Sequence, residues 1–153
     1  MFASCAQKSK MITLEEDSGI ISDGAVMAVE IEGVLFDLVV SKSPEAKMKG
    51  LSRIDQIPEN GMIFLFDSPQ YLIFWMKDMR FSIDIIWVNG NKIVGIAENA
   101  QNEPPNTPDS YLKKYLSGVK ADKVIELNAG DAKKFNIKEG SIIKIKNGEE
   151  NGK

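Results

Sequence analysis

The sequence contains no histidine and only one cysteine, Cys5, among its 153 residues. Serine and cysteine nucleophiles that depend on an imidazole base are therefore excluded within this chain, as are histidine-ligated zinc, iron and copper sites. A single cysteine cannot form an internal disulfide, a CxxC redox pair or a cysteine-ligated metal site. Any chemistry must use carboxylates, lysine, arginine, tyrosine or backbone groups, and we predict neither a metal nor a cofactor.

The sequence also lacks an excess of positive charge and long apolar runs. The formal net charge is −3 and no dense cluster of Lys and Arg is interleaved with aromatic residues, so we expect no nucleic-acid partner. No apolar run approaches the roughly 18 residues of a membrane-spanning helix, and we therefore predict no transmembrane segment. The nucleotide-binding motifs GxxxxGK[ST] and GxGxxG are absent, and so is an EF-hand calcium loop.

The first residues contain a motif of their own. Phe2-Ala3-Ser4-Cys5 is similar to the end of a bacterial lipobox, in which small residues precede a cysteine that is lipidated after cleavage. A polar stretch follows over residues 6–10, as a tether would, but the charged and apolar regions of a signal peptide are missing. Two interpretations stay open: Cys5 is the lipid anchor of an extracytoplasmic protein, or it is an exposed cysteine in a frayed terminus. In both, residues 1–24 form a flexible arm or tether.

Residues 61–100 are the stretch around which we expect the fold to be organised. Four short apolar runs, rich in Ile, Val and Phe and containing both tryptophans, each end in turn-forming residues, which indicates strands rather than helices. Asn89-Gly90 is the strongest turn signal, because a two-residue type I′ hairpin turn requires positive φ at both positions. We therefore predict that this segment is an antiparallel meander that carries most of the core.

The flanking segments predict further strands and short helices. Their patterns indicate a hairpin over 25–40 that turns at Glu32-Gly33, a helix from N-cap Ser43 to Gly50, strands at 123–127 and 141–145, and a helix at about 132–135. Residues 101–110 contain three prolines and predict an extended loop, a kind of segment that often serves as a lid or binding loop, while residues 111–118 fit either a helical turn or more loop.

The predicted fold class is α+β. We expect one β-rich domain over residues 25–146, with a mostly antiparallel curved sheet or partly closed barrel and two or three short helices. Residues 147–153 are predicted to be a disordered tail.

Several sequence blocks occur in an order that resembles one known family. The blocks are Met48-Lys49-Gly50-Leu51-Ser52, Ile57-Pro58-Glu59-Asn60-Gly61-Met62-Ile63-Phe64, Phe74-Trp75-Met76-Lys77, Ile83-Asp84-Ile85-Ile86, Val124-Ile125-Glu126-Leu127-Asn128-Ala129-Gly130 and Ile137-Lys138-Glu139-Gly140-Ser141. They resemble the bacterial and archaeal family called domain of unknown function 192, over about residues 27–145. The resemblance implies a compact β-rich α+β domain, often secreted or membrane-tethered, and no established activity. Arg53 comes one position earlier than the family's arginine, so whether it takes that arginine's place is open.

Two carboxylates lie in predicted strands. Burying an unpaired carboxylate costs several kcal/mol, so Asp84, between isoleucines, needs hydrogen-bond donors, solvent or a raised pKa. Asp84 is either a structural group held by backbone N–H groups, Lys77 or Arg80, or a functional one. Glu126 lies either on a solvated strand face or in the same site. If the two converge, they form a candidate catalytic pair for acid–base or glycosidic chemistry.

The run Trp75-Met76-Lys77 combines apolar walls with one charged group, which is typical of a ligand pocket but also of a core strand. Gly130, at a predicted helix start, could offer backbone N–H groups to an anion. We therefore favour a non-catalytic, secreted or lipid-tethered module that binds an unknown small molecule or envelope partner. Its predicted binding residues are Trp75, Met76, Lys77, Asp84, Glu126 and Gly130. The alternatives are a carboxylate-dependent hydrolase or lyase that acts on a carbohydrate-like substrate, and a structural or assembly protein without a pocket.

Overall fold

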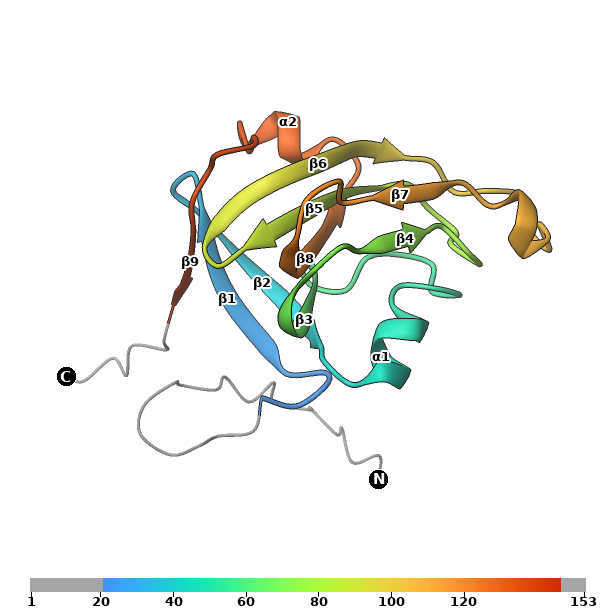
Figure 1. Ribbon diagram of the computed structural model, residues 1–153, viewed down its shortest axis with the longest axis horizontal. Helices are drawn as coiled ribbons and strands as arrows, with labels where there is room; N and C mark the ends of the chain where they lie inside the picture. The colour runs from blue at the N-terminus through green and yellow to red at the C-terminus, as the bar shows by residue number, and fades with distance from the viewer. Residues whose placement is uncertain (1–20, 147–153) are drawn as a thin grey trace, which may run out of the picture.

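A curled seven-stranded sheet is the frame of the molecule, which is described here by a computed structural model for residues 21–146 (Figure 1). Its strand order is β6-β5-β8-β3-β2-β1-β9. These strands are β1 (Val26–Ile31), β2 (Val34–Ser41), β3 (Gly61–Gln70), β5 (Ile83–Asn89), β6 (Lys92–Ala100), β8 (Ala121–Asn128) and β9 (Ile143–Lys146). The predicted β-rich fold with a curved sheet is confirmed.

A second, two-stranded sheet and three short helical segments complete the described part of the chain. The small sheet pairs β4 (Ile73–Trp75) with β7 (Lys114–Leu116), and Figure 1 shows it lying over one face of the large sheet. The helical segments are α1 (Pro44–Lys49), the 3-10 turn η1 (Asp109–Tyr111) and α2 (Asp131–Lys134).

Local sequence signals set α1 and the first hairpin as predicted. The Ser43 side chain accepts a hydrogen bond from the backbone N–H of Ala46, and Pro44 occupies the first helical position. The helix ends at Gly50. β1 and β2 pair antiparallel around Glu32 and Gly33, whose φ values of 50° and 76° are the left-handed conformation that a tight hairpin turn requires.

The meander predicted over residues 61–100 is wrong. β3 pairs in parallel with β2 and antiparallel with β8, and β4 leaves the large sheet. Of the four strands in residues 61–100, only β5 and β6 follow each other in sequence and also pair with each other. The cause is β8, which comes later in the chain but inserts between β3 and β5. Gly61 is required at this junction, because a Cβ atom there would lie 2.2 Å from the backbone oxygen of Glu126.

The two edges of the curled sheet approach each other. Lys92 of β6 bridges to Ile142, and the N–H of Ile93 donates to the carbonyl of Ser141 at 2.9 Å. The N–H of Ile143 donates in turn to the carbonyl of Asn91. The sheet is therefore nearly closed at this seam, and its last strand begins at Ile143 rather than at Ser141 as predicted.

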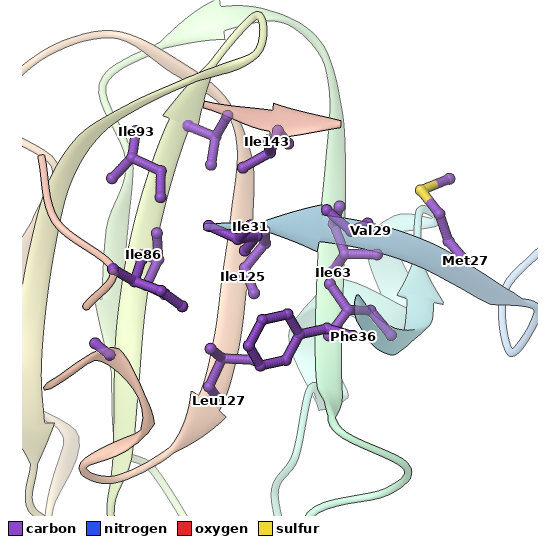
Figure 2. Close-up of a cluster of buried hydrophobic side chains, with 14 of the residues drawn as sticks. Met27, Val29, Ile31, Phe36, Ile63, Ile86, Ile93, Ile125, Leu127 and Ile143 are labelled. Carbon is purple, nitrogen blue, oxygen red and sulfur yellow. The ribbon is translucent and has the colours of Figure 1, made fainter. Parts of the chain in front are cut away.

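Apolar side chains pack on both faces of the sheet. The inner core lies inside the curl, and Figure 2 shows ten of its labelled members converging from separate strands. They are Met27, Val29, Ile31, Phe36, Ile63, Ile86, Ile93, Ile125, Leu127 and Ile143. The outer core lies on the opposite face of β3, β5 and β8, and its buried members are Leu51, Phe64, Leu72, Met76, Met79, Ile83, Ile85, Trp87, Ala100, Ala121 and Val124.

Two parts of the chain cover the outer core. We call the β4–β7 sheet with its neighbouring residues, 71–77 and 109–120, the flap. The flap packs Phe74 edge-on against Phe64 of β3, with ring centroids 5.2 Å apart. The second part, residues 51–57, contributes Leu51 and the partly buried Ile54 and Ile57. The outer core is thus closed by connecting segments, whereas the inner core is closed by the curl of the sheet together with residues 132–137.

Candidate functional site

Asp84 is fully buried on the inner face of β5 and is completely occupied by backbone donors. Its Oδ1 accepts from the N–H of Asn99 at 2.8 Å, and its Oδ2 accepts from the N–H groups of Gly130 at 3.0 Å and Ala132 at 2.9 Å. The carboxylate therefore joins the end of β6 to the start of α2. Three such bonds compensate the cost of burying the group and leave it little capacity for a ligand.

Gly130 donates its N–H to a group of the protein itself. The backbone N–H of Gly130, which we predicted to bind an anion, donates instead to the Asp84 carboxylate. The helix that follows, α2, is only four residues long. Burial is the main cause that raises the pKa of Asp131 in α2. Nearby Lys134 opposes this effect, and the negative charge of Asp84 adds to it. The surroundings of Gly130 are accordingly a structural junction.

Glu126 presents the opposite situation. Only 6% of the residue is exposed, and within residues 21–146 its carboxyl group has no hydrogen-bond or ion-pair partner. Burial alone raises the pKa of Glu126 to about 8, so the group is mostly protonated at neutral pH. Its neighbours across the sheet are Met62 of β3 and Ile85 of β5, both of which pack in the outer core.

The register of β5 and β8 places the two carboxylates on opposite faces of the sheet. Asp84 lies opposite Leu127, a member of the inner core, while Glu126 lies opposite Ile85, a member of the outer core. Residues paired directly across two strands share a face, and successive residues alternate. The convergence of Asp84 and Glu126 that an acid–base pair needs is therefore not found.

A second polar group in the outer core also has no partner. The indole N–H of Trp87 is buried without a hydrogen bond to any described residue. Trp87 follows Ile85 by two positions on β5 and so shares the face that holds Glu126. The Trp87 N–H is notable on this face, because nearly all fully buried polar atoms in proteins find a partner.

The predicted run Trp75-Met76-Lys77 is divided between two environments. Met76 is buried in the outer core, whereas the Trp75 side chain lies on the outer surface of the flap and is 39% exposed. The ammonium groups of Lys114 and Lys77 lie 3.9 and 5.2 Å from the Trp75 ring centroid. Lys77 also forms an ion pair with Asp109 at 2.8 Å. Trp75 and Lys77 therefore form a surface feature, separate from the buried groups.

Ion pairs connect residues 51–57 to residues 78–80, which follow the first segment of the flap. Arg53 pairs with Asp78 at 3.0 Å, and its backbone N–H donates to the carbonyl of the same residue at 2.9 Å. Both residues have left-handed φ values, 63° and 55°. Arg80 pairs with Asp55 at 2.6 Å. Non-glycine residues in this conformation store of order 1–3 kcal/mol each, so the cover is held under some strain.

Two hollows in the structure lie elsewhere. The smaller has a volume of about 20 Å³, room for roughly one water molecule. It is lined by Ile21, Ala25, Val26, Met27, Ala28, Val40, Ile145 and Lys146. The larger is open, has a volume of about 510 Å³ and is lined by Asn89, Lys92, Ile93, Val94, Val119, Lys120, Glu139 and Gly140. Neither is lined by a predicted site residue.

Three further observations bear on the predictions. Within residues 21–146, no group of three or more metal-ligating side chains is placed to hold a metal ion. None of the helices in the described part of the chain is long and apolar enough to cross a membrane. Cys5 lies outside the described residues, so its lipidation stays a prediction.

Sequence reasoning missed the partners of Trp75. Lys114 is directly paired with Trp75, and Leu116 with Ile73, across the small sheet. The pairing joins residues about forty positions apart, and no local pattern predicts it. The adjacent lysines 113 and 114, directly after the proline-containing loop, were the available signal.

Comparison with known proteins agrees with this architecture. A protein from Sinorhizobium meliloti 1021, named as a candidate transcription regulator, is 25% identical to this chain. The match has a TM-score of 0.68 and covers 81% of this chain and 96% of that one. A protein of unknown function from Novosphingobium aromaticivorans DSM 12444 is 26% identical, with a TM-score of 0.68 and coverage of 78% and 84%. No curated protein matches this sequence.

The family comparison covers nearly all of the described structure. Residues 27–145 match the sequence model of domain of unknown function 192, which is described as an uncharacterised ACR family. The resemblance identified from the sequence blocks is thereby confirmed. No activity is established for this family. The chain belongs to the domain of unknown function 192 family.

Proposed function

We propose that this protein is a small non-catalytic binding module whose ligand contacts the protonated carboxyl group of Glu126. The supporting observation is the state of that group: it is nearly buried, has no partner among the described residues, and has a pKa raised to about 8. Retaining such a group costs stability, and groups retained at a cost are frequently functional. The unpartnered N–H of Trp87 on the same face offers a second contact.

The chemistry of the site defines a class of ligand. A protonated carboxyl group presents one hydrogen-bond donor and one acceptor side by side. A neutral group with the same arrangement, such as a primary amide or a pair of vicinal hydroxyls on a sugar, pairs with it without bringing charge into the outer core. The apolar neighbours Met62 and Ile85 favour a ligand with an adjoining apolar part.

The cover can admit a ligand at low cost. Exposed ion pairs such as Arg53–Asp78 and Arg80–Asp55 contribute only about 0–1 kcal/mol each. Relief of the left-handed strain at Arg53 and Asp78 further offsets the loss of their contact. Separation of residues 51–57 from residues 78–80 therefore opens a route toward the outer core while the curled sheet stays intact.

A hydrolase or lyase with Asp84 and Glu126 as acid and base receives no support from this geometry. The two groups lie on opposite faces, and all three backbone bonds of Asp84 are structural. The name of the Sinorhizobium protein suggests regulation of transcription. For this chain that role has no counterpart in the Glu126 site, which contains no positive charge.

The ligand proposal is tested by saturation-transfer NMR with a panel of primary amides and monosaccharides. We expect at least one panel member to bind at pH 6 and to bind about tenfold more weakly at pH 9, where Glu126 is ionised. Glu126→Leu removes the hydrogen-bonding groups and should abolish binding, while Glu98→Gln, at an exposed position of β6, should not change it. Binding that survives in Glu126→Leu, or no binding by any member, contradicts the proposal.

We also propose that the module is extracytoplasmic and is anchored through a lipid on Cys5. The support comes from the sequence, in which the small residues Ala3 and Ser4 precede the cysteine and a polar stretch follows. The test is intact-mass spectrometry of the protein made in its host from the full-length gene. A mass increase of a diacylglyceryl group that is absent in Cys5→Ser supports the anchor, and an unmodified Cys5 overturns it.

A further inference from the structure

The flap concentrates the exposed apolar side chains of the described structure. Nine large apolar side chains are exposed in the described part of the chain, and six of these nine belong to the flap. The six are Tyr71, Ile73, Trp75, Tyr111, Leu116 and Val119. A group of this kind on one small element differs from the scattered apolar residues that every protein surface carries, and it indicates a contact surface.

The outer side of the small sheet is arranged in two rows. Ile73 and Leu116 are directly paired across β4 and β7 and are 63% and 62% exposed. In the next row Trp75 is paired with Lys114, whose ammonium group lies 3.9 Å from the indole ring. Phe74 and Tyr115 alternate to the other side and pack against the outer core. The outer side is therefore apolar at its Ile73–Leu116 end and positively charged at its Trp75–Lys114 end.

The charge of the flap is opposite to that of the whole chain. Its two segments contain four lysines and one aspartate, a formal charge of +3, whereas the chain has a net charge of −3. The lysines are Lys77, Lys113, Lys114 and Lys120. The flap is thus a basic, apolar element on an acidic protein. It complements a partner that has negative charge at its surface and an apolar layer directly below that surface.

We propose that the flap docks onto the interface of an anionic lipid membrane. Tryptophan and tyrosine are enriched at the membrane–water interface, where the ring is buried and its polar atom stays hydrated. Lysine stems cover apolar surface while the ammonium groups reach the lipid phosphates. Trp75, with Ile73 and Leu116 beside it, would enter the headgroup region, and Lys77 and Lys114, whose ammonium groups lie beside the Trp75 ring, would bind the charged lipids.

A lipid membrane fits this surface better than a protein partner or a nucleic acid does. A protein interface of ordinary size needs a larger continuous contact than the single outer side of two three-residue strands offers. A nucleic-acid site would not place the exposed apolar pair Ile73 and Leu116 beside the lysines, because phosphate contacts need positive charge and not apolar surface. The inference is independent of a ligand at Glu126 and does not require a lipid on Cys5.

The experiment is vesicle co-sedimentation of the full chain with the Cys5→Ser substitution, which removes any lipid anchor. Vesicles of phosphatidylcholine with added phosphatidylglycerol are compared with vesicles of phosphatidylcholine alone. We expect binding to the anionic vesicles only, weakened by salt, together with a blue shift of the tryptophan fluorescence, which we assign to the exposed Trp75 because Trp87 is already buried. Neutralising two lysines near an anionic surface weakens binding by roughly 25-fold, and Lys77→Glu/Lys114→Glu reverses both charges, so it should lower partitioning by at least that factor.

Matched variants separate the flap from the rest of the surface. Ile73→Ser/Leu116→Ser should lower partitioning by about tenfold or more, because less apolar area is transferred from water. Lys133→Glu/Lys138→Glu makes the same charge change near α2. Leu35→Ser/Met48→Ser removes exposed apolar groups elsewhere on the surface. The partitioning of either control onto anionic vesicles should stay within about twofold of that of the parent chain.

Three results overturn the proposal. The first is no binding of the Cys5→Ser chain with an unaltered flap to anionic vesicles. The second is an equal loss of binding in the α2 control, which would indicate attraction by general charge. The third is salt-dependent binding to duplex DNA that is tighter than to vesicles and is lost in the flap variants.

Discussion

Two carboxylates on neighbouring strands of one sheet have opposite fates in this protein. Asp84, on the inner face, accepts three backbone N–H groups and fixes the junction between β6 and α2. Glu126, on the outer face, has no partner among the described residues and has a pKa of about 8. Both are almost wholly buried, so burial alone does not decide whether an acid is tied into the structure. The difference lies in whether the chain itself supplies donors.

The largest expected effect follows from replacing Asp84. Asp84→Asn keeps the shape of the side chain but turns one acceptor into an N–H₂ group that faces a backbone N–H. A buried donor left unpaired costs about 1–3 kcal/mol, and bonds to a charged acceptor are the stronger kind, so we expect a loss of about 4 kcal/mol. The measurement is urea unfolding at neutral pH. Asp67→Asn, at an exposed position of β3, should change the free energy of unfolding by less than about 0.5 kcal/mol. An Asp84→Asn variant as stable as wild type would remove the structural assignment.

The sequence predicts that Asp84 needs hydrogen-bond donors, but not which groups donate to it. An aspartate between isoleucines in a strand must find donors, and this much follows from the pattern. The donors themselves come from Asn99 and from Gly130 and Ala132, which are far from Asp84 in sequence. Nothing local identifies them, because the order of β5, β6 and β8 decides which loops meet.

The second expected effect concerns Glu126 and depends on pH. Its pKa is raised in the folded state, so between about pH 4.5 and 8 the unfolded chain releases a proton that the folded chain keeps. The native state then binds more protons, and stability falls as pH rises through this range. Glu126→Gln removes the effect and should be stabilising by on the order of 3 kcal/mol at pH 8, but nearly neutral at pH 4.5. Thermal unfolding at several pH values measures it.

A control separates this effect from general titration of the acidic protein. Glu98→Gln changes the same functional group at an exposed position of β6 and should give a nearly constant difference from wild type across the range. If Glu126→Gln is less stable than wild type at pH 8, the carboxylate of Glu126 has a stabilising partner in solution and the contrast with Asp84 disappears.

The fold shows the same division between local and long-range information. The helix from Ser43 to Gly50 and the hairpin turn at Glu32-Gly33 were predicted because each is determined by adjacent residues. The meander over 61–100 was wrong because β8 inserts between β3 and β5. The alternation along β8 predicts that Glu126 and Leu127 point to opposite faces of the sheet. It does not predict which face is inner and which is outer, because both faces of β8 are buried.

The third effect tests whether the cover of the outer core is weaker than the inner core. Ser117 connects the two strands of the flap: its Oγ accepts from the N–H of Leu72 at 3.0 Å and donates to the carbonyl of Val119 at 2.6 Å. Ser117→Ala should cost about 1–2 kcal/mol, because the buried N–H of Leu72 loses its acceptor. Hydrogen exchange should accelerate in β4 and β7 and stay unchanged in β1 and β2. Acceleration throughout the sheet would show that the flap and the sheet unfold as one unit.

The smallest expected effect concerns the ion pairs that close the cover. Arg80 pairs with Asp55 at 2.6 Å, but both side chains are more than half exposed, at 55% and 86%. A short distance on an exposed surface adds little stability, because water and salt screen the attraction and ordering two long side chains costs entropy. Arg80→Ala should therefore lower the free energy of unfolding by less than about 0.5 kcal/mol while increasing ligand access to Glu126. A double-mutant cycle with Asp55→Ala measures the coupling, and a coupling energy well above about 1 kcal/mol would mean that the cover is locked, which is incompatible with entry by separation of residues 51–57 from residues 78–80.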